Sequence, residues 1–143
     1  MNRIQKIAVY NLVVFSITSL LTTTAVIILS VTIGWPKASA GLACLSIGAF
    51  GAFSPLIFKK DPGAVTFDER DRMLNRTAAL GGFAASYLWF CLTGTAFVML
   101  LSPELLKNFG LPLMCFGGMF VVYIVHSIIV LVLYGRVSSD GEK

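Results

Sequence analysis

The chain has 143 residues, of which 57% are hydrophobic and only 13% are charged, and its formal net charge at pH 7 is +4. Its mean hydropathy is +0.85, and an ordinary soluble domain carries about 25% charged residues. This composition excludes an ordinary soluble domain. It predicts an integral membrane protein with a single transmembrane domain over residues 1–143.

Four apolar blocks without Asp, Glu, Lys or Arg follow one another along the chain, at residues 7–33, 38–58, 77–101 and 111–134. Each is long enough to cross a hydrocarbon core of about 30 Å, which takes about 20 helical residues. None alternates apolar with polar side chains, as the roughly 10-residue strands of a membrane barrel do. We therefore predict an all-α fold, an integral membrane four-helix bundle.

The first block has a second interpretation, as a secretory signal peptide. Arg3 and Lys6 would form its basic region, and Ala38-Ser39-Ala40 resembles a cleavage site. However, the apolar region of a signal peptide is usually about 7–15 residues long, and this block is nearly twice that length. We therefore interpret residues 7–33 as the first membrane helix.

Basic residues determine the predicted orientation, because Lys and Arg accumulate in the short cytoplasmic loops of membrane proteins. With both termini in the cytoplasm, nine of the eleven Lys and Arg residues are cytoplasmic, and only Lys37 and Lys107 lie outside. We therefore expect both termini and the loop at residues 59–76 to face the cytoplasm. A multi-pass protein of the cell membrane is the predicted localisation.

Charged side chains are concentrated in that loop, KKDPGAVTFDERDRMLNR. Thr66 and Glu69 have the spacing of a capping box, and Asp68 precedes Arg72 by four residues. The third helix is therefore expected to begin in the loop and to extend out of the membrane. The five basic and four acidic residues of the loop nearly cancel, so we expect no nucleic acid as a partner, and electrostatic binding of anionic lipid is a weaker hypothesis than docking of a protein.

Two interpretations of the loop remain open. The simpler one is a helix start combined with an anchor that sets membrane orientation. The functional one is a docking surface for a cytoplasmic or membrane protein partner. Its candidate residues are Asp68, Glu69, Arg70 and Arg72.

The stretch FDERDRMLNRTAAL resembles the Asp-Glu-Arg signature in the middle loop of small prokaryotic four-helix membrane proteins of undefined biochemical role. In that signature an aliphatic residue, a basic residue and an alanine follow at the start of the third helix. Asp68, Glu69 and Arg70 match the signature, and Leu74, Arg76 and Ala78 fall close to the pattern that follows it. The resemblance implies a bacterial or archaeal cytoplasmic-membrane protein, and it supplies no catalytic residue.

Small residues mark the faces on which the predicted helices pack, because helices in lipid associate through close contact of small side chains. The stripe in the second block is Ala40, Cys44, Gly48 and Ala52, and the stripe in the third block is Ala78, Gly82 and Ser86. We expect both stripes to pack within one molecule. A homo-oligomer interface is the alternative.

Polar residues inside the spans are few, and His126 is the only acidic or basic residue among them. Trp89 and Tyr123 are predicted to lie near the midplane, at a depth comparable to His126. The three are expected to form a packed, hydrogen-bonded core. The alternative is a polar cluster lining a quinone, haem or lipid pocket, but a lone histidine supplies a single ligand, so no cofactor and no metal is predicted.

The sequence contains no recognisable catalytic constellation. The clustered carboxylates of the loop are accounted for by helix capping and ion pairing, and no histidine accompanies them. We therefore predict that the protein is not an enzyme but a non-catalytic membrane protein, an accessory, regulatory or interaction component that uses residues 59–76. The alternative is a small dimeric transporter or a small-molecule-binding membrane protein, although proton-coupled export normally needs an embedded carboxylate.

Overall fold

The computed structural model describes residues 3–58 and 69–140. Within these residues every regular element is a helix. The elements in chain order are α1 Arg3–Ile33, α2 Trp35–Ala38, η1 Ser39–Phe53, α3 Ser54–Ile57, α4 Glu69–Leu100, α5 Pro103–Leu105, η2 Leu106–Gly110 and α6 Leu111–Asp140.

Four of the helical segments are long and apolar enough to cross a membrane: Arg3–Ile33, Ser39–Ile57, Glu69–Leu100 and Pro103–Gly135. The predicted all-α class, with four helices long and apolar enough to span a membrane, is therefore confirmed. The third helix begins at Glu69, eight residues before its apolar block, as the charge pattern of the loop indicates. The capping residues proposed for it, Thr66 and Asp68, lie outside the described residues.

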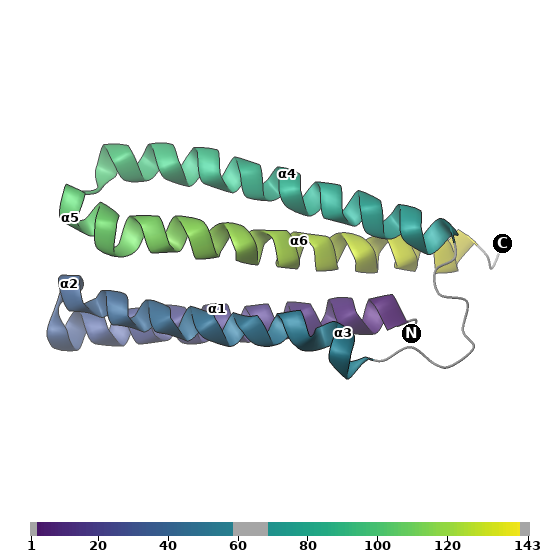
Figure 1. Cartoon of the computed structure of the whole chain (residues 1–143), viewed down its shortest axis with the longest axis horizontal. Helices are drawn as coiled ribbons and strands as arrows, with labels where there is room; N and C mark the ends of the chain where they lie inside the picture. The colour runs from purple at the N-terminus through teal and green to yellow at the C-terminus, as the bar shows by residue number, and fades with distance from the viewer. Residues whose placement is uncertain (1–2, 59–68, 141–143) are drawn as a thin grey trace.

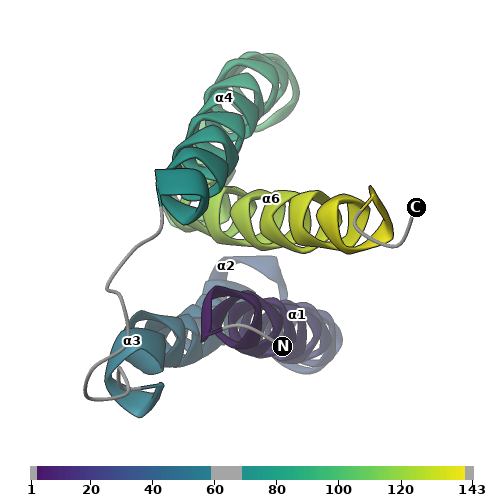
Figure 2. The same cartoon turned by 90° about the vertical axis from the view of Figure 1, so that its right-hand side faces the viewer.

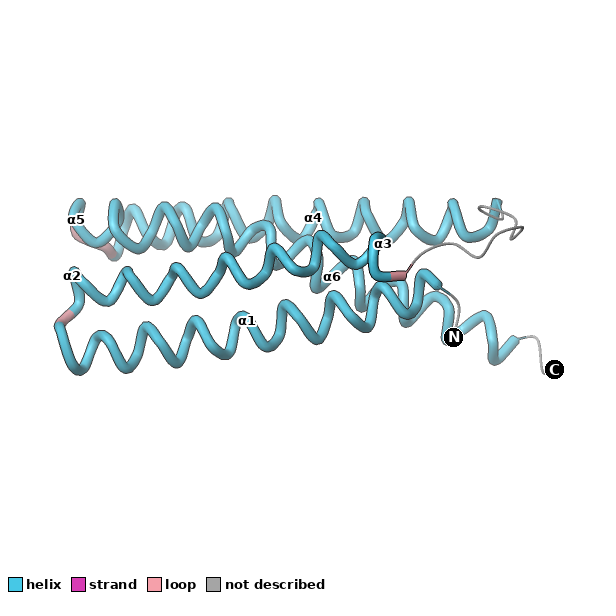
Figure 3. Tube along the Cα trace, turned by 60° about the horizontal axis from the view of Figure 1, so that its bottom comes forward, coloured by secondary structure: helices cyan, strands magenta, loops and turns pink. Residues whose placement is uncertain are grey.

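The four spans form two antiparallel hairpins, α1 with η1 and α4 with α6 (Figure 1). The beginning of α1 and the end of α6 lie at one end of the molecule, and α2 and α5 lie at the other (Figures 1 and 3). Contacts run in the order α4, α6, α1, η1, whereas α4 and η1 share almost none. The helices therefore form an open, bent row rather than a closed square (Figure 2).

The connection at the α2 end of the first hairpin is a single glycine. Gly34 has a φ of +88°, a conformation that L side chains rarely adopt. α2 starts at the next residue, and Pro36 occupies a position in its first turn, where a missing backbone N–H costs nothing. The chain therefore reverses without a loop.

The second span is a 3-10 helix over the 15 residues of η1. A 3-10 helix rises about 2.0 Å per residue, so η1 is about 30 Å long, whereas an α-helix of the same residues would reach about 22 Å. The stretched geometry lets a short apolar segment match its longer neighbours. It also changes which residues share a face, because the repeat becomes three residues.

The packing stripe predicted for this span is wrong at its two ends. Ala40 and Ala52 are exposed, Cys44 is half-buried, and Gly48 is buried as predicted. The buried residues of the segment are Gly41, Leu45, Gly48, Gly51 and Ser54, and from Leu45 onward they are three apart. The prediction assumed an α-helical period, whereas the 3-10 period buries every third residue in this part of the span.

Phe15 of α1 is the centre of the core, and none of its surface is exposed. Its ring meets Phe120 edge-on with a centroid distance of 4.9 Å, and it stacks on Tyr123 at 4.7 Å. Gly48 and Gly51 of η1 lie against the same ring. The two glycines therefore make room for a phenylalanine that joins three spans.

The interface between α4 and α6 is formed by the small residues predicted for the third span. Ala78, Gly82 and Ser86 are buried on α4, and a Cβ at Gly82 would lie 2.9 Å from the Val122 carbonyl oxygen of α6. The two backbones are therefore in close contact. Packing of this stripe within one molecule is confirmed.

Candidate functional site

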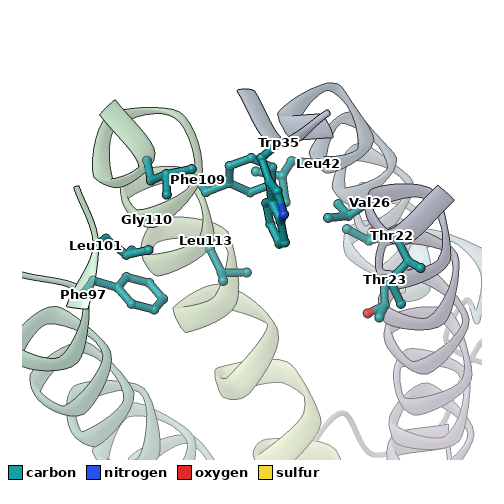
Figure 4. Close-up of a pocket in the computed structure, with 12 residues that line it drawn as sticks. Thr22, Thr23, Val26, Trp35, Leu42, Phe97, Leu101, Phe109, Gly110 and Leu113 are labelled. Carbon is teal, nitrogen blue, oxygen red and sulfur yellow. The ribbon is translucent and has the colours of Figure 1, made fainter. Parts of the chain in front are cut away.

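A cavity of about 550 Å³ lies between the two hairpins, at the end that carries α2 and α5 (Figure 4). Side chains from both hairpins line it. They are Thr22, Thr23, Val26, Ile27, Trp35, Leu42, Phe97, Leu101, Leu105, Phe109, Gly110 and Leu113. Sequence reasoning did not find this site, because its residues come from seven separate elements and share no motif.

The wall of this cavity is almost entirely hydrocarbon. The two threonine hydroxyls that reach it are already used, since Thr22 Oγ1 donates to the Thr18 carbonyl at 2.8 Å and Thr23 Oγ1 donates to the Ser19 carbonyl at 2.9 Å. The cavity is suited to an apolar guest rather than to a polar one.

An aromatic pair bridges the two hairpins at the end of the cavity. The rings of Trp35 and Phe109 meet edge-on, with their centroids 5.6 Å apart (Figure 4). Phe109 is held by the turn at Gly110, which is buried beside Leu101 and Phe97. Ser102 caps the short helix before it, as its hydroxyl accepts a bond from the Leu105 amide.

The three polar residues predicted to cluster in the membrane each have a different neighbour. Tyr123 stacks on Phe15 of α1, and Trp89 lies against Gly117 of α6 with its indole N–H buried and without a hydrogen-bond partner. His126 Nε2 lies 3.0 Å from Oδ1 of Asn75 on α4. Among the described residues no hydrogen bond or ring contact joins any two of the three.

Asn75 is a partner that sequence reasoning missed. It lies in α4 two residues before the third apolar block, inside the charged loop. One signal was available: an amide side chain next to an apolar block needs a hydrogen-bonding partner, and the fourth span offers a single histidine. Sequence alone does not show that the two share a face of the α4–α6 interface.

The proposed docking residues lie on the first turns of α4. Glu69, Arg70 and Arg72 are exposed, and Asp68 lies outside the described residues. Asp71, between them, accepts a hydrogen bond from the Tyr134 hydroxyl of α6. This bond ties the charged start of α4 to the end of α6.

The same end of the molecule has a second tie between distant segments. Arg3 of α1 donates from Nε to the Phe58 carbonyl and from Nη2 to the Pro55 carbonyl, at 2.5 and 3.3 Å. The beginning of α1 is thereby joined to the end of the second span. In the described part of the chain, no three His, Cys, Asp or Glu side chains gather as metal ligands would.

Comparison with known proteins adds no relative: no protein-family model, curated protein or solved structure matches the chain. The fold and the sites described above therefore rest on the chain's own residues. They define a four-span helical protein of membrane composition with an apolar cavity at one end and a charged helix start at the other.

Proposed function

We propose that the chain is a multi-pass protein of a prokaryotic cytoplasmic membrane, and that it acts as a non-catalytic accessory or regulatory component. The partner binds the first turns of α4 on the cytoplasmic side. The observation that carries this proposal is the exposure of Glu69, Arg70 and Arg72 on a helix start that Asp71 fixes to Tyr134. A charged surface held in place loses little conformational freedom when a partner binds it.

The orientation is supported by the distribution of charge. Nine of the eleven Lys and Arg residues fall at the termini or in the loop at 59–76, and both α1 and α4 begin at the same end of the molecule (Figure 1). The resemblance of FDERDRMLNRTAAL to the Asp-Glu-Arg signature of prokaryotic membrane proteins supports the same placement. The interior spans supply a scaffold that holds the docking surface at the membrane face.

Orientation is tested by cysteine labelling of intact cells. Cys44, Cys91 and Cys115 are first replaced by alanine, and single cysteines are then introduced as Glu69→Cys and Lys37→Cys. A membrane-impermeant maleimide is expected to label the Lys37→Cys protein in intact cells and the Glu69→Cys protein only after permeabilisation. The reverse pattern would place the docking surface outside the cytoplasm and overturn this part of the proposal.

Docking is tested by affinity purification in mild detergent from the native host. Glu69, Arg70 and Arg72 are changed together to opposite charges, and the proteins that copurify are compared with those of the wild type. The control changes Lys6 and Lys107, which are also exposed, to glutamate. Loss of a partner in the first variant alone supports docking, and identical partners in all three preparations remove this surface from the function.

A further inference from the structure

Lys37 and Lys107, the two basic residues that are predicted to lie outside the cytoplasm, are both at the end of the molecule that carries α2 and α5. Lys37 follows Trp35 by two residues in α2, and Lys107 precedes Phe109 by two residues in η2. The rings of Trp35 and Phe109 meet at the end of the apolar cavity. The two exceptions to the orientation rule therefore flank one aromatic pair, one on each hairpin.

Both lysines are exposed, and the two connections at this end hold one acidic residue, Glu104, which is exposed as well. The local charge is therefore +1, from two lysines and one glutamate. This excess is too small to hold an anionic lipid by charge alone, but here it lies at the end of an apolar cavity that can hold a hydrocarbon chain. A lysine at the membrane surface attracts an anionic headgroup. Trp35 is 59% exposed, as expected of a ring at the boundary between tails and headgroups.

We propose that the cavity binds one hydrocarbon chain of an anionic membrane phospholipid, whose headgroup lies between Lys37 and Lys107. The hydrocarbon chain of the lipid is favoured by the largely apolar wall, in which the two threonine hydroxyls already donate to carbonyl groups of their own helix. The headgroup is specified by the lysines. The Trp35–Phe109 pair marks the level at which the ligand changes from tail to headgroup.

The size and position of the cavity fit this occupant. Its volume of about 550 Å³ lies within the range of about 300–1,000 Å³ found for small-molecule sites. It lies between two hairpins that meet mainly through α6 and α1, so one side of the helix row stays open (Figure 2). In this proposal the hydrocarbon chain of the lipid enters the cavity directly from the interior of the bilayer.

The test uses Trp35 as a fluorescent reporter in nanodiscs. Trp89→Phe leaves Trp35 as the only tryptophan of the chain. The discs are made of phosphatidylcholine and contain a small mole fraction of one brominated lipid, either phosphatidylglycerol or phosphatidylcholine. Bromine on the lipid chains quenches indole fluorescence on contact. Brominated phosphatidylglycerol is expected to reach half-maximal quenching at a lower mole fraction than brominated phosphatidylcholine.

Charge variants test the headgroup contact. One lysine near an anionic membrane surface contributes about 1 kcal/mol, so Lys37→Gln and Lys107→Gln are each expected to reduce the preference for phosphatidylglycerol about fivefold. Glu104→Gln is expected to increase that preference, and Lys6→Gln, at the opposite end, to leave it unchanged. Equal quenching by the two lipids in the parent protein, or equal effects of Lys6→Gln and Lys37→Gln, would overturn headgroup recognition.

Cavity variants test the chain site. Thr23→Phe and Leu113→Phe fill the cavity, whereas Val31→Phe adds the same ring to α1 at a position that is 81% exposed and does not line it. Both filling variants are expected to reduce quenching to the level given by lipid around the protein, and the control to retain it. Retained quenching in a filled and folded variant would overturn the proposal. If both filling variants aggregate, the exposed lysine variants still decide whether the site binds an anionic lipid.

Discussion

His126 of α6 and Asn75 of α4 are joined by a hydrogen bond of 3.0 Å between Nε2 and Oδ1. An amide oxygen can only accept, so Nε2 carries the hydrogen in this contact. The bond crosses the interface at which Gly82 lets the two backbones approach closely. His126 therefore has a structural partner on the neighbouring span, which favours the packed-core interpretation of this histidine.

A double-mutant cycle on this pair measures the value of the contact. We expect Asn75→Leu and His126→Phe each to lower the free energy of unfolding, and their combination to cost less than the sum. The coupling is expected to be about 0.6 to 2 kcal/mol, the range found for hydrogen bonds between membrane helices. Unfolding in mixed micelles, followed by circular dichroism, provides the measurement. Strict additivity of the two changes would show that the bond contributes nothing to stability.

Two glycines of α4 should respond differently to the same substitution. A Cβ at Gly82 would lie 2.9 Å from the Val122 carbonyl oxygen, part of a backbone that cannot turn aside, so Gly82→Ala should cost about 1 to 3 kcal/mol. A Cβ at Gly94 would meet Met114 at an ordinary 3.5 Å. Gly94→Ala should therefore be neutral or stabilising by up to about 1 kcal/mol, because alanine favours the helix. Thermal unfolding in the same detergent compares the two.

The hydrogen bond from Tyr134 to Asp71 holds the docking surface, and Tyr87 provides a control position for testing it. Tyr134→Phe removes the hydroxyl that donates to Asp71 and should lower stability by about 1 to 2 kcal/mol. Tyr87, also on a spanning helix, is 70% exposed, and Tyr87→Phe should change stability by less than about 0.5 kcal/mol. Hydrogen exchange of the first α4 amides should accelerate in the first variant alone. Equal exchange in both would show that Tyr134 does not anchor this helix start.

Phe15 and Gly51 should be strongly coupled. A Cβ at Gly51 would lie 2.6 Å from the Phe15 ring, so Gly51→Ala should be clearly destabilising in the parent protein. In a Phe15→Ala background the ring is absent, and the same substitution should cost almost nothing. We expect a coupling of about 1 to 3 kcal/mol. A Gly51→Ala penalty that is unchanged by the loss of Phe15 would place the strain elsewhere in η1.

Much of the fold follows from the sequence because membrane burial imposes simple constraints. Long uncharged blocks predict the spans, and the charge pattern around Glu69 predicts the early start of the third helix. The stripe of Ala78, Gly82 and Ser86 predicts a packing face on the third span, since small residues four apart share one face of an α-helix. The structure shows that α6 is the partner of this face. Each of these signals is local, so a single sequence contains it.

The rest depends on information that local patterns do not carry. The 3-10 geometry of η1 shifts the buried face from Ala40 and Ala52 to residues three apart, because helix period is set by the fit to neighbouring spans as well as by composition. The open row of helices and the cavity between its hairpins arise from packing order. No spacing in the sequence connects Trp35 with Phe109, which are 74 residues apart.

The 3-10 geometry also makes the second span sensitive to bilayer thickness. Conversion of the 15 residues of η1 to an α-helix would shorten the segment by about 7 Å, since the rise falls by about 0.5 Å per residue. A thinner bilayer favours a shorter span through hydrophobic mismatch. We therefore expect the conformation of this span to depend on the length of the surrounding lipid chains.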